Sequence, residues 1–118
     1  MKRILIIEDD DLIRNLLVSF VEHTRKFDGV DSVMTGEEAM LLFEPGKYSL
    51  IVIDLSLVLM SGAEVCLLIC QQDKDVNILG MTGYKELVDN ADILTTGFNK
   101  MFLKPFEYKD FFDYVESL

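Results

Sequence analysis

Two short apolar runs that end directly in acidic residues constrain the fold of this chain more than any other feature. Residues 4–7 (Ile-Leu-Ile-Ile) are followed by the acidic residues 8–11 (Glu-Asp-Asp-Asp), and residues 50–53 (Leu-Ile-Val-Ile) are followed by Asp54. Short continuous apolar runs of this kind are typical of strands buried on both faces of a parallel sheet. Because ligands bind at the carboxyl ends of such strands, the two runs predict several carboxylates around one crevice.

The length and composition fit one globular domain over residues 1–118. The residues are 50% hydrophobic and 27% charged, which favours a single buried core over a disordered chain. The net charge of −10 and the lack of a run of Lys or Arg argue against direct binding of nucleic acid. No apolar stretch approaches the roughly 18 residues of a membrane-spanning helix. The first run is also too short for a signal peptide, so we expect a cytoplasmic protein without a membrane partner.

Helical periodicity alternates with short apolar runs along the chain. After Asp11, apolar residues recur with the i, i+3, i+4 spacing of an amphipathic helix, and later segments repeat this change of period. Capping-box spacings at Thr35 and Ser61 predict two further helix starts. The expected strands are 4–7, 30–34, 50–53, 76–81 and 101–103, and the expected helices start near Asp11, Thr35 and Ala63, span residues 87–94, and start at Tyr108. Five strand–helix units predict a doubly wound α/β fold, a five-stranded parallel sheet with helices on both faces.

Residues of complementary chemistry follow four of the predicted strands. Glu8 and Asp9 follow the first, Asp54 the third, Thr82 the fourth and Lys104 the fifth. A few carboxylates completed by waters favour Mg²⁺ among hard cations. A metal ion, an ammonium and a hydroxyl stabilise the charge of a transferred phosphoryl group, and an adjacent aspartate can act as the nucleophile. This edge of the predicted sheet therefore suits phosphoryl transfer to an aspartate.

Other residues with chemical potential have structural interpretations. Asp10 and Asp11 suit the N-cap and first turn of a helix, where a carboxylate meets the helix dipole. Cys66 and Cys70 lie four residues apart in an apolar segment, which predicts packing against the core. The only histidine, His23, stands among polar residues late in the first helix, so we expect it to be solvated.

Taken together, these residues resemble the response regulator receiver domain of two-component signalling. Its markers are an acidic pair, a phosphoacceptor aspartate, a hydroxyl residue followed by a small one, and a Lys-Pro pair, each after its own strand. Here those positions are Glu8-Asp9, Asp54, Thr82-Gly83 and Lys104-Pro105, and the resemblance extends from Lys2 to Leu118. The resemblance implies a flavodoxin-like (βα)5 fold.

The resemblance also implies a function for the acidic edge. Asp54 would accept a phosphoryl group from a histidine kinase or phosphotransfer protein, and the domain would catalyse only its own phosphorylation and dephosphorylation. Mg²⁺ would be held by Asp9, Asp54 and the backbone carbonyl of Ser56, with Glu8 acting mostly through water. The residues implied to contact the phosphoryl group are Thr82, Gly83 and Lys104.

The partners implied by the resemblance are known only by class. The phosphodonor would approach the rim of the acidic crevice. The face of the last two helices, near Tyr108 and Tyr114, is the usual surface of the family for homodimers or targets. The chain would be either a stand-alone receiver or the amino-terminal part of a longer regulator.

Two departures from the family pattern leave other functions open. Val58 stands where the family usually has a proline, and Met101 stands where an aromatic residue usually reports phosphorylation. These changes leave open a receiver-like interaction module with altered or no phosphate readout. A small aspartyl-phosphate hydrolase would need an aspartate in place of Ser56 as general acid. The loop of residues 55–60 is unusually apolar, and we expect it to be partly buried.

Overall fold

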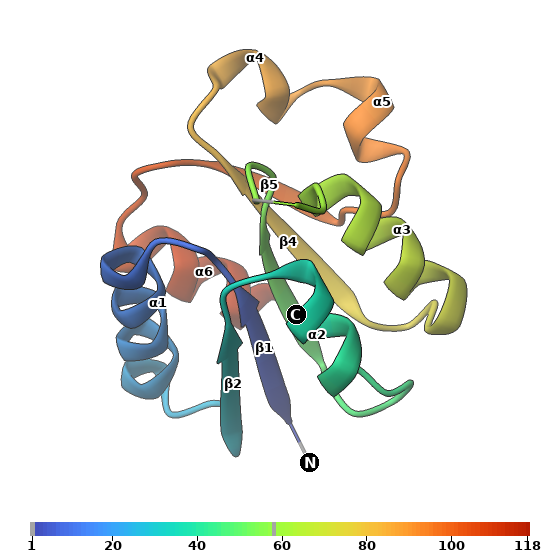
Figure 1. Ribbon diagram of the computed structural model, residues 1–118. Helices are drawn as coiled ribbons and strands as arrows, with labels where there is room; N and C mark the ends of the chain where they lie inside the picture. The colour runs from blue at the N-terminus through green and yellow to red at the C-terminus, as the bar shows by residue number, and fades with distance from the viewer. Residues whose placement is uncertain (1, 58) are drawn as a thin grey trace.

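The computed structural model describes residues 2–57 and 59–118 (Figure 1). Five parallel strands form one sheet in the order β2-β1-β3-β4-β5. The strands are β1 (Arg3–Ile7), β2 (Gly29–Val33), β3 (Leu50–Asp54), β4 (Asn77–Thr82) and β5 (Lys100–Leu103). The helices are α1 (Asp11–Thr24), α2 (Gly36–Leu42), α3 (Gly62–Gln72), α4 (Lys85–Val88), α5 (Ala91–Leu94) and α6 (Tyr108–Ser117). Each strand bound differs from the predicted one by at most one residue, and within the described residues no helix is long and apolar enough to cross a membrane.

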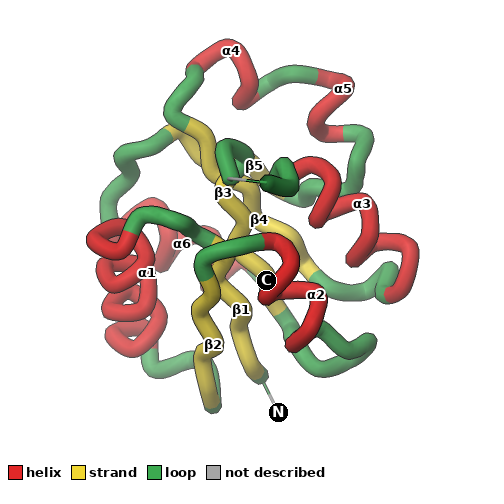
Figure 2. Tube along the Cα trace, viewed as in Figure 1, coloured by secondary structure: helices red, strands yellow, loops and turns green. Residues whose placement is uncertain are grey.

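The adjacent strands β1 and β3 are buried on both faces, which explains their continuous apolar runs. Leu5 and Ile7 of β1 pack in one core cluster with residues of α2 and α3. Ile4 and Ile6 pack in a second cluster, on the opposite face, with residues of α1 and α6. Figure 2 shows these two pairs of helices on either side of the strands. The predicted doubly wound parallel sheet is confirmed.

The helix starts follow the predicted capping residues. The side chains of Asp10, Thr35 and Ser61 each accept a hydrogen bond from the backbone N–H three residues on, at 3.0, 3.1 and 3.2 Å. Each of these bonds satisfies an amide that the first helical turn leaves without a partner. The structural role predicted for Asp10 is therefore confirmed.

The single helix predicted around residues 87–94 is wrong. The structure has two separate helical turns there, α4 and α5, because the side chain of Asn90 accepts a hydrogen bond from the N–H of Ile93 at 3.0 Å and starts a new turn. Within the described chain, neither turn has a fully buried side chain, and the half-buried Val88 of α4 and Ile93 of α5 pack against the core, so tertiary packing on this segment is limited.

The cysteines pack as predicted. Cys66 is buried and Cys70 half-buried, and their thiols face the backbone carbonyls of Thr96 and Gly97, at 3.7 and 3.8 Å. His23 is exposed, and its ring lies edge-on to that of Tyr108. All these contacts are consistent with structural roles.

A buried tyrosine ties the edge strand β2 to the segment before β3. The hydroxyl of Tyr48 donates a hydrogen bond to Asp31 Oδ2 at 2.7 Å, and the guanidinium of Arg3 pairs with Asp31 Oδ1 at 2.9 Å. The hydrogen bond from Tyr48 and the charge of Arg3 hold the pKa of Asp31 below its usual value of 3.8. The ionised form of Asp31 is therefore favoured by folding.

We expect Tyr48→Phe to lower the free energy of unfolding at pH 7 by about 1–2 kcal/mol, because Asp31 loses a charge-assisted hydrogen bond. Since the folded pKa of Asp31 lies below its unfolded value, its contribution is present above the unfolded pKa. It is lost as the pH falls through the folded pKa. Urea denaturation at pH 7 and at a series of lower pH values should show the difference between the variant and wild type shrinking in acid.

The exposed Tyr84 offers a matched control for the same loss of a hydroxyl. Tyr84→Phe should change the free energy of unfolding by less than about 0.5 kcal/mol. A Tyr48→Phe protein as stable as wild type at pH 7 would contradict the role of the Tyr48–Asp31 bond.

Candidate functional site

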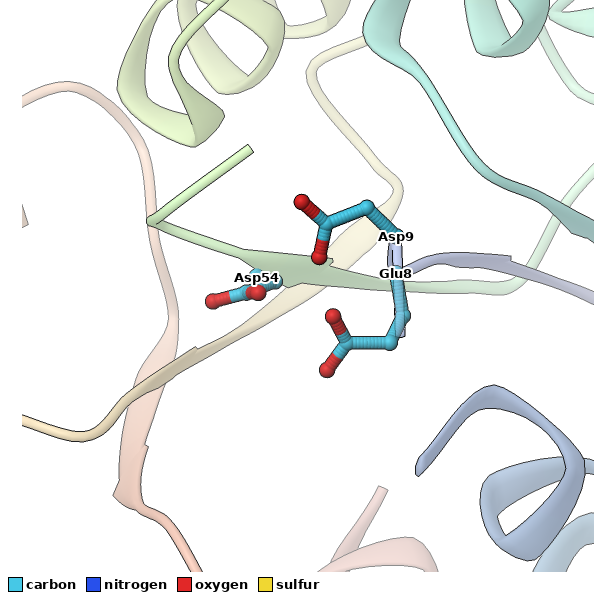
Figure 3. A group of neighbouring side chains, drawn as sticks. All are labelled: Glu8, Asp9 and Asp54. Atoms are coloured by element: carbon cyan, nitrogen blue, oxygen red, sulfur yellow. The ribbon is translucent and has the colours of Figure 1, made fainter. Parts of the chain in front are cut away.

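Three carboxylates meet at the carboxyl ends of the adjacent strands β1 and β3. Glu8 and Asp9 directly follow β1, and Asp54 is the last residue of the neighbouring strand β3. One oxygen from each side chain lies within 4.8 Å of the others, and Figure 3 shows the three groups converging on one space. The predicted acidic cluster is therefore present.

Lys104 connects two of these carboxylates. Its ammonium lies 3.2 Å from Glu8 Oε1 and 3.2 Å from Asp54 Oδ2. Glu8 is 0% and Asp54 2% exposed, so both charges lie out of bulk water. The other oxygen of Asp54 accepts a hydrogen bond from the backbone N–H of Ser56 at 3.1 Å. Buried carboxylates of this kind are stable only when they are paired and hydrogen-bonded, as they are here.

The cluster carries more negative charge than Lys104 neutralises. Burial, a hydrogen bond with Asp54 and the charge of Asp54 raise the pKa of Glu8 to about 7, against the smaller opposing effect of Lys104. Burial acts to lower the pKa of Lys104, but the charges of Asp54 and Glu8 outweigh it and raise that pKa overall. Near neutral pH, Glu8 and Asp54 are thus held close together at an electrostatic cost that a proton or a cation relieves.

Thr82 lies at the same edge of the sheet, as the buried last residue of β4. Its hydroxyl oxygen accepts a hydrogen bond from the N–H of Tyr84 at 3.1 Å. Its carbonyl accepts one from the N–H of Lys104 at 2.7 Å, which joins the ends of β4 and β5. Gly83 is exposed, and a Cβ built on it would meet nothing within 4 Å. Thr82, Gly83 and Lys104 thus lie on adjoining segments. Their contact with a phosphoryl group stays a prediction.

The segments in which the chain departs from the family pattern are only partly accessible. In the loop after β3, Leu55, Leu57 and Met60 are half-buried, whereas Leu59 is 84% exposed and has a φ of 73°. Mixed burial of this loop is confirmed. Val58, predicted to alter its backbone, lies outside the described residues.

Met101 lies inside the core rather than on the surface. It is buried with Phe98 on the side of the sheet that α3 covers. A Cβ built on Gly80 would lie 2.5 Å from Met101 Cε and 2.9 Å from Phe98 Cδ1, so the glycine makes room for both side chains. The peptide bond between Lys104 and Pro105 that follows β5 is cis.

Sequence reasoning missed one residue at this edge, Arg14. Its guanidinium donates a hydrogen bond to the backbone carbonyl of Glu8 at 3.0 Å and pairs with the carboxylate of Asp11. The i, i+3 spacing of Asp11 and Arg14 on a helix was the signal for the ion pair. The contact with Glu8 depends on how the strand meets the helix, which no local spacing reveals.

Comparisons with known proteins agree with this geometry. The sequence model of the response regulator receiver domain matches residues 4–116. The chain is 30% identical to the response regulator receiver protein CpdR of Brucella abortus, across 100% of this chain and 97% of that protein. It is 32% identical to the alkaline phosphatase synthesis transcriptional regulatory protein PhoP of Bacillus subtilis, covering 92% of this chain but 45% of the relative.

Solved structures show the same fold. The response regulator TrrA of Thermotoga maritima, crystallised in complex with Mg²⁺-BeF, is 29% identical and has a TM-score of 0.86 over 99% of this chain and 98% of that chain. A CheY-like receiver domain from Methanospirillum hungatei gives a TM-score of 0.86 at 22% identity. Several curated relatives are longer, and the chain spans about half of their length.

The pKa of Glu8 should respond in opposite directions to its two charged neighbours. In the metal-free protein, Asp54→Asn removes a hydrogen-bond partner and a negative charge, so the pKa of Glu8 should fall below 7. Lys104→Met removes the positive charge, so that pKa should rise. Side-chain carboxyl shifts followed by ¹³C NMR across pH measure both. Lys109→Met, at an exposed lysine paired with Asp113, should leave the Glu8 titration unchanged; equal titrations in all variants would contradict the coupling.

Gly80→Ala should destabilise the protein because a new methyl group must displace the buried ends of Met101 and Phe98. We expect the free energy of unfolding to fall by about 1–3 kcal/mol, the usual cost of overpacking a core. Gly83→Ala is the matched control, with an expected change below about 0.5 kcal/mol. Urea denaturation followed by circular dichroism compares the two variants, and similar losses in both would argue against the packing role of Gly80.

Proposed function

The chain belongs to the response regulator receiver domain family, and from this we propose that Asp54 is the phosphoacceptor of a signalling switch. The observation that carries the proposal is the burial of Asp54 between the ammonium of Lys104 and the N–H of Ser56, beside two further carboxylates. An aspartate at a helix start or on a surface loop needs none of these partners.

In the proposed reaction, an oxygen of Asp54 forms a bond to phosphorus while the bond from phosphorus to the donor breaks. The leaving group of the donor keeps the bonding electrons and takes up a proton. Lys104 lies within hydrogen-bonding reach of Asp54 Oδ2, so its charge faces the oxygens that carry the developing negative charge. The same residues would hold phosphorylated Asp54 and would also hydrolyse it. The domain would therefore act on itself rather than turn over a separate substrate.

Thr82 and Gly83 have supporting roles in this proposal. Among the described residues the Thr82 hydroxyl acts only as an acceptor, from the N–H of Tyr84, so its proton is available for donation to a phosphoryl oxygen. Gly83 leaves the same edge open, since it has no side chain and the space that a Cβ would occupy has no neighbour within 4 Å.

The acidic cluster fits a hard divalent cation. Its donors are all oxygens, they lie within 4.8 Å of one another, and the charge of Lys104 alone does not balance them. We assign Asp9, Asp54 and the backbone carbonyl of Ser56 to Mg²⁺, with Glu8 beside them. When bound, the ion would supply positive charge to the phosphoryl oxygens. The Mg²⁺-BeF complex of the Thermotoga maritima relative supports this choice.

The partner proposed for this site is a histidine kinase or phosphotransfer protein, which would reach Asp54 from the open edge of the sheet. The face formed by α4, α5 and α6 is the proposed contact for a second copy or a target. Tyr114 of α6 is half-buried against Phe102 of β5. Tyr108 instead packs against Phe20 and His23 of α1, so the expectation that Tyr108 lies near this face is wrong. In a longer regulator, this receiver domain would be the amino-terminal part, and an output domain would follow it in the same chain.

A receiver with an altered readout is the second candidate, favoured by the burial of Met101. Its side chain already lies in the core over Gly80 and lacks an aromatic ring. Phosphorylation of Asp54 would then not move the Met101 side chain. The structural change would be transmitted from the site through other residues.

The proposal predicts a covalent adduct on Asp54. Wild type incubated with Mg²⁺ and a small phosphodonor should gain the mass of one phosphoryl group, and Asp54→Asn should gain none. Asp10→Asn is the matched control, because Asn caps a helix as Asp does and residue 10 lies outside the cluster. Intact-mass spectrometry measures all three. A wild type without adduct, or an Asp54→Asn protein that keeps it, would reject Asp54 as the acceptor.

Amide shifts in the presence of Mg²⁺ and beryllofluoride separate the two candidates. Movement of the amides of α4, α5 and α6 favours the usual switch. An adduct that leaves these amides unmoved favours the altered readout. Steady turnover of phosphomonoesters would instead indicate a hydrolase.

A further inference from the structure

Arg14 links the helix that follows the acidic loop to the backbone of that loop. Its Nη1 donates to the carbonyl oxygen of Glu8 at 3.0 Å, and its Nη2 pairs with the Asp11 carboxylate. The side chain is only 14% exposed. The backbone N–H of Glu8 is itself bonded to the carbonyl of Val33 in β2 at 3.1 Å, so both main-chain polar groups of Glu8 are anchored.

The residues between these anchors are also tied to α1. The side chain of Asp10 caps the helix, and the carbonyl of Asp10 accepts a hydrogen bond from the N–H of Arg14 at 2.9 Å. The loop that carries Asp9 is thus held at one end by the sheet and at the other by the first helical turn, with the guanidinium of Arg14 bridging the two. Through this hydrogen bond a side chain of α1 reaches the backbone of Glu8.

We propose that Arg14 is a positioning residue for the cation site, a role that rests on the proposed function. It fixes the main chain from which Glu8 and Asp9 project, and the hydrogen bonds described for its guanidinium go to the Glu8 carbonyl and the Asp11 carboxylate rather than to the cluster. A planar guanidinium can donate to a carbonyl and a carboxylate at the same time, in fixed directions. The ammonium of a lysine, on a flexible stem, does not reproduce that fork.

Charge and geometry make opposite predictions for this residue. If Arg14 acted only through its positive charge, its removal would strengthen the attraction of the acidic site for a cation. If it acts by holding the loop, its removal weakens binding, because the carboxylates lose their fixed spacing. Loss of an outer contact that orients metal ligands typically costs roughly tenfold or more in affinity.

Titration of Mg²⁺ into wild type, Arg14→Gln and Arg14→Lys, followed by amide NMR shifts, tests the proposal. We expect both variants to bind Mg²⁺ roughly tenfold more weakly than wild type. Lys26→Gln removes one positive charge just after the far end of the same helix, where Lys26 pairs with Glu116, and should stay within about twofold of wild type. Thermal melting of each variant shows that it is folded before the titration.

A metal-free readout accompanies the titration. Amide hydrogen exchange of residues 9–11 should be faster in both Arg14 variants than in wild type, because the loop has lost its bridge to Glu8. At saturating Mg²⁺, the maximal rate of phosphorylation by a small phosphodonor should stay within about threefold of wild type, while the Mg²⁺ concentration for half-maximal rate rises.

Four results would overturn the positioning role. Arg14→Gln could bind Mg²⁺ as tightly as wild type or more tightly, which would show that the bridge does not hold the ligands in place. Arg14→Lys could restore wild-type affinity, which would show that the guanidinium fork is not needed. Unchanged amide exchange in both variants would show that the loop does not depend on the bridge. A wild type that binds no Mg²⁺ would reject the proposed cation site together with this inference, whereas the other outcomes reject only the role of Arg14.

Discussion

The burial of two carboxylates beside a single ammonium is the constraint on which the rest of this structure depends. Glu8 and Asp54 are held at the ends of adjacent strands, almost without contact with water, and Lys104 pairs with both. Like charges at this spacing oppose folding unless partners compensate for them. The doubly covered sheet supplies the apolar surface that offsets this unfavourable arrangement, since β1 and β3 are buried on both faces.

Strand order decides which side chains share the site. Because β1 lies next to β3, the carboxylates meet at the middle of the carboxyl edge of the sheet. Because β4 and β5 follow β3 in the strand order, Thr82 and Lys104 lie on one side of these carboxylates. The backbone hydrogen bond from Lys104 to Thr82 fixes the relation between these last two residues. The site is therefore a product of parallel topology rather than of any one loop.

The sequence was most informative where local chemistry decides the structure. The strands that carry Glu8 and Asp54 were predictable because burial on both faces demands continuous apolar runs, and the helix starts because Asp10, Thr35 and Ser61 cap them locally. The break between α4 and α5 was not predictable in this way. Asn90 fits either a polar helical position or a cap, and the limited tertiary packing of this segment of the described chain decides between them.

Contacts between distant segments were also beyond sequence reasoning. The bridge from Arg14 to the Glu8 carbonyl depends on the angle at which α1 leaves the sheet. The burial of Met101 depends on the space above Gly80, a residue on the neighbouring strand. The acidic cluster itself was predicted, because its residues follow strands whose ends must share an edge.

The shallow packing of α4 and α5 has a thermodynamic consequence. Within the described residues these two short turns have no fully buried side chain, and they begin three residues after Thr82. Opening this segment exposes the half-buried Val88 and Ile93 but no fully buried side chain, so we expect its local unfolding to cost less free energy than that of the fully buried strands β1 and β3. The part of the molecule next to the hydroxyl edge can thus rearrange on its own while the sheet and its carboxylates stay fixed.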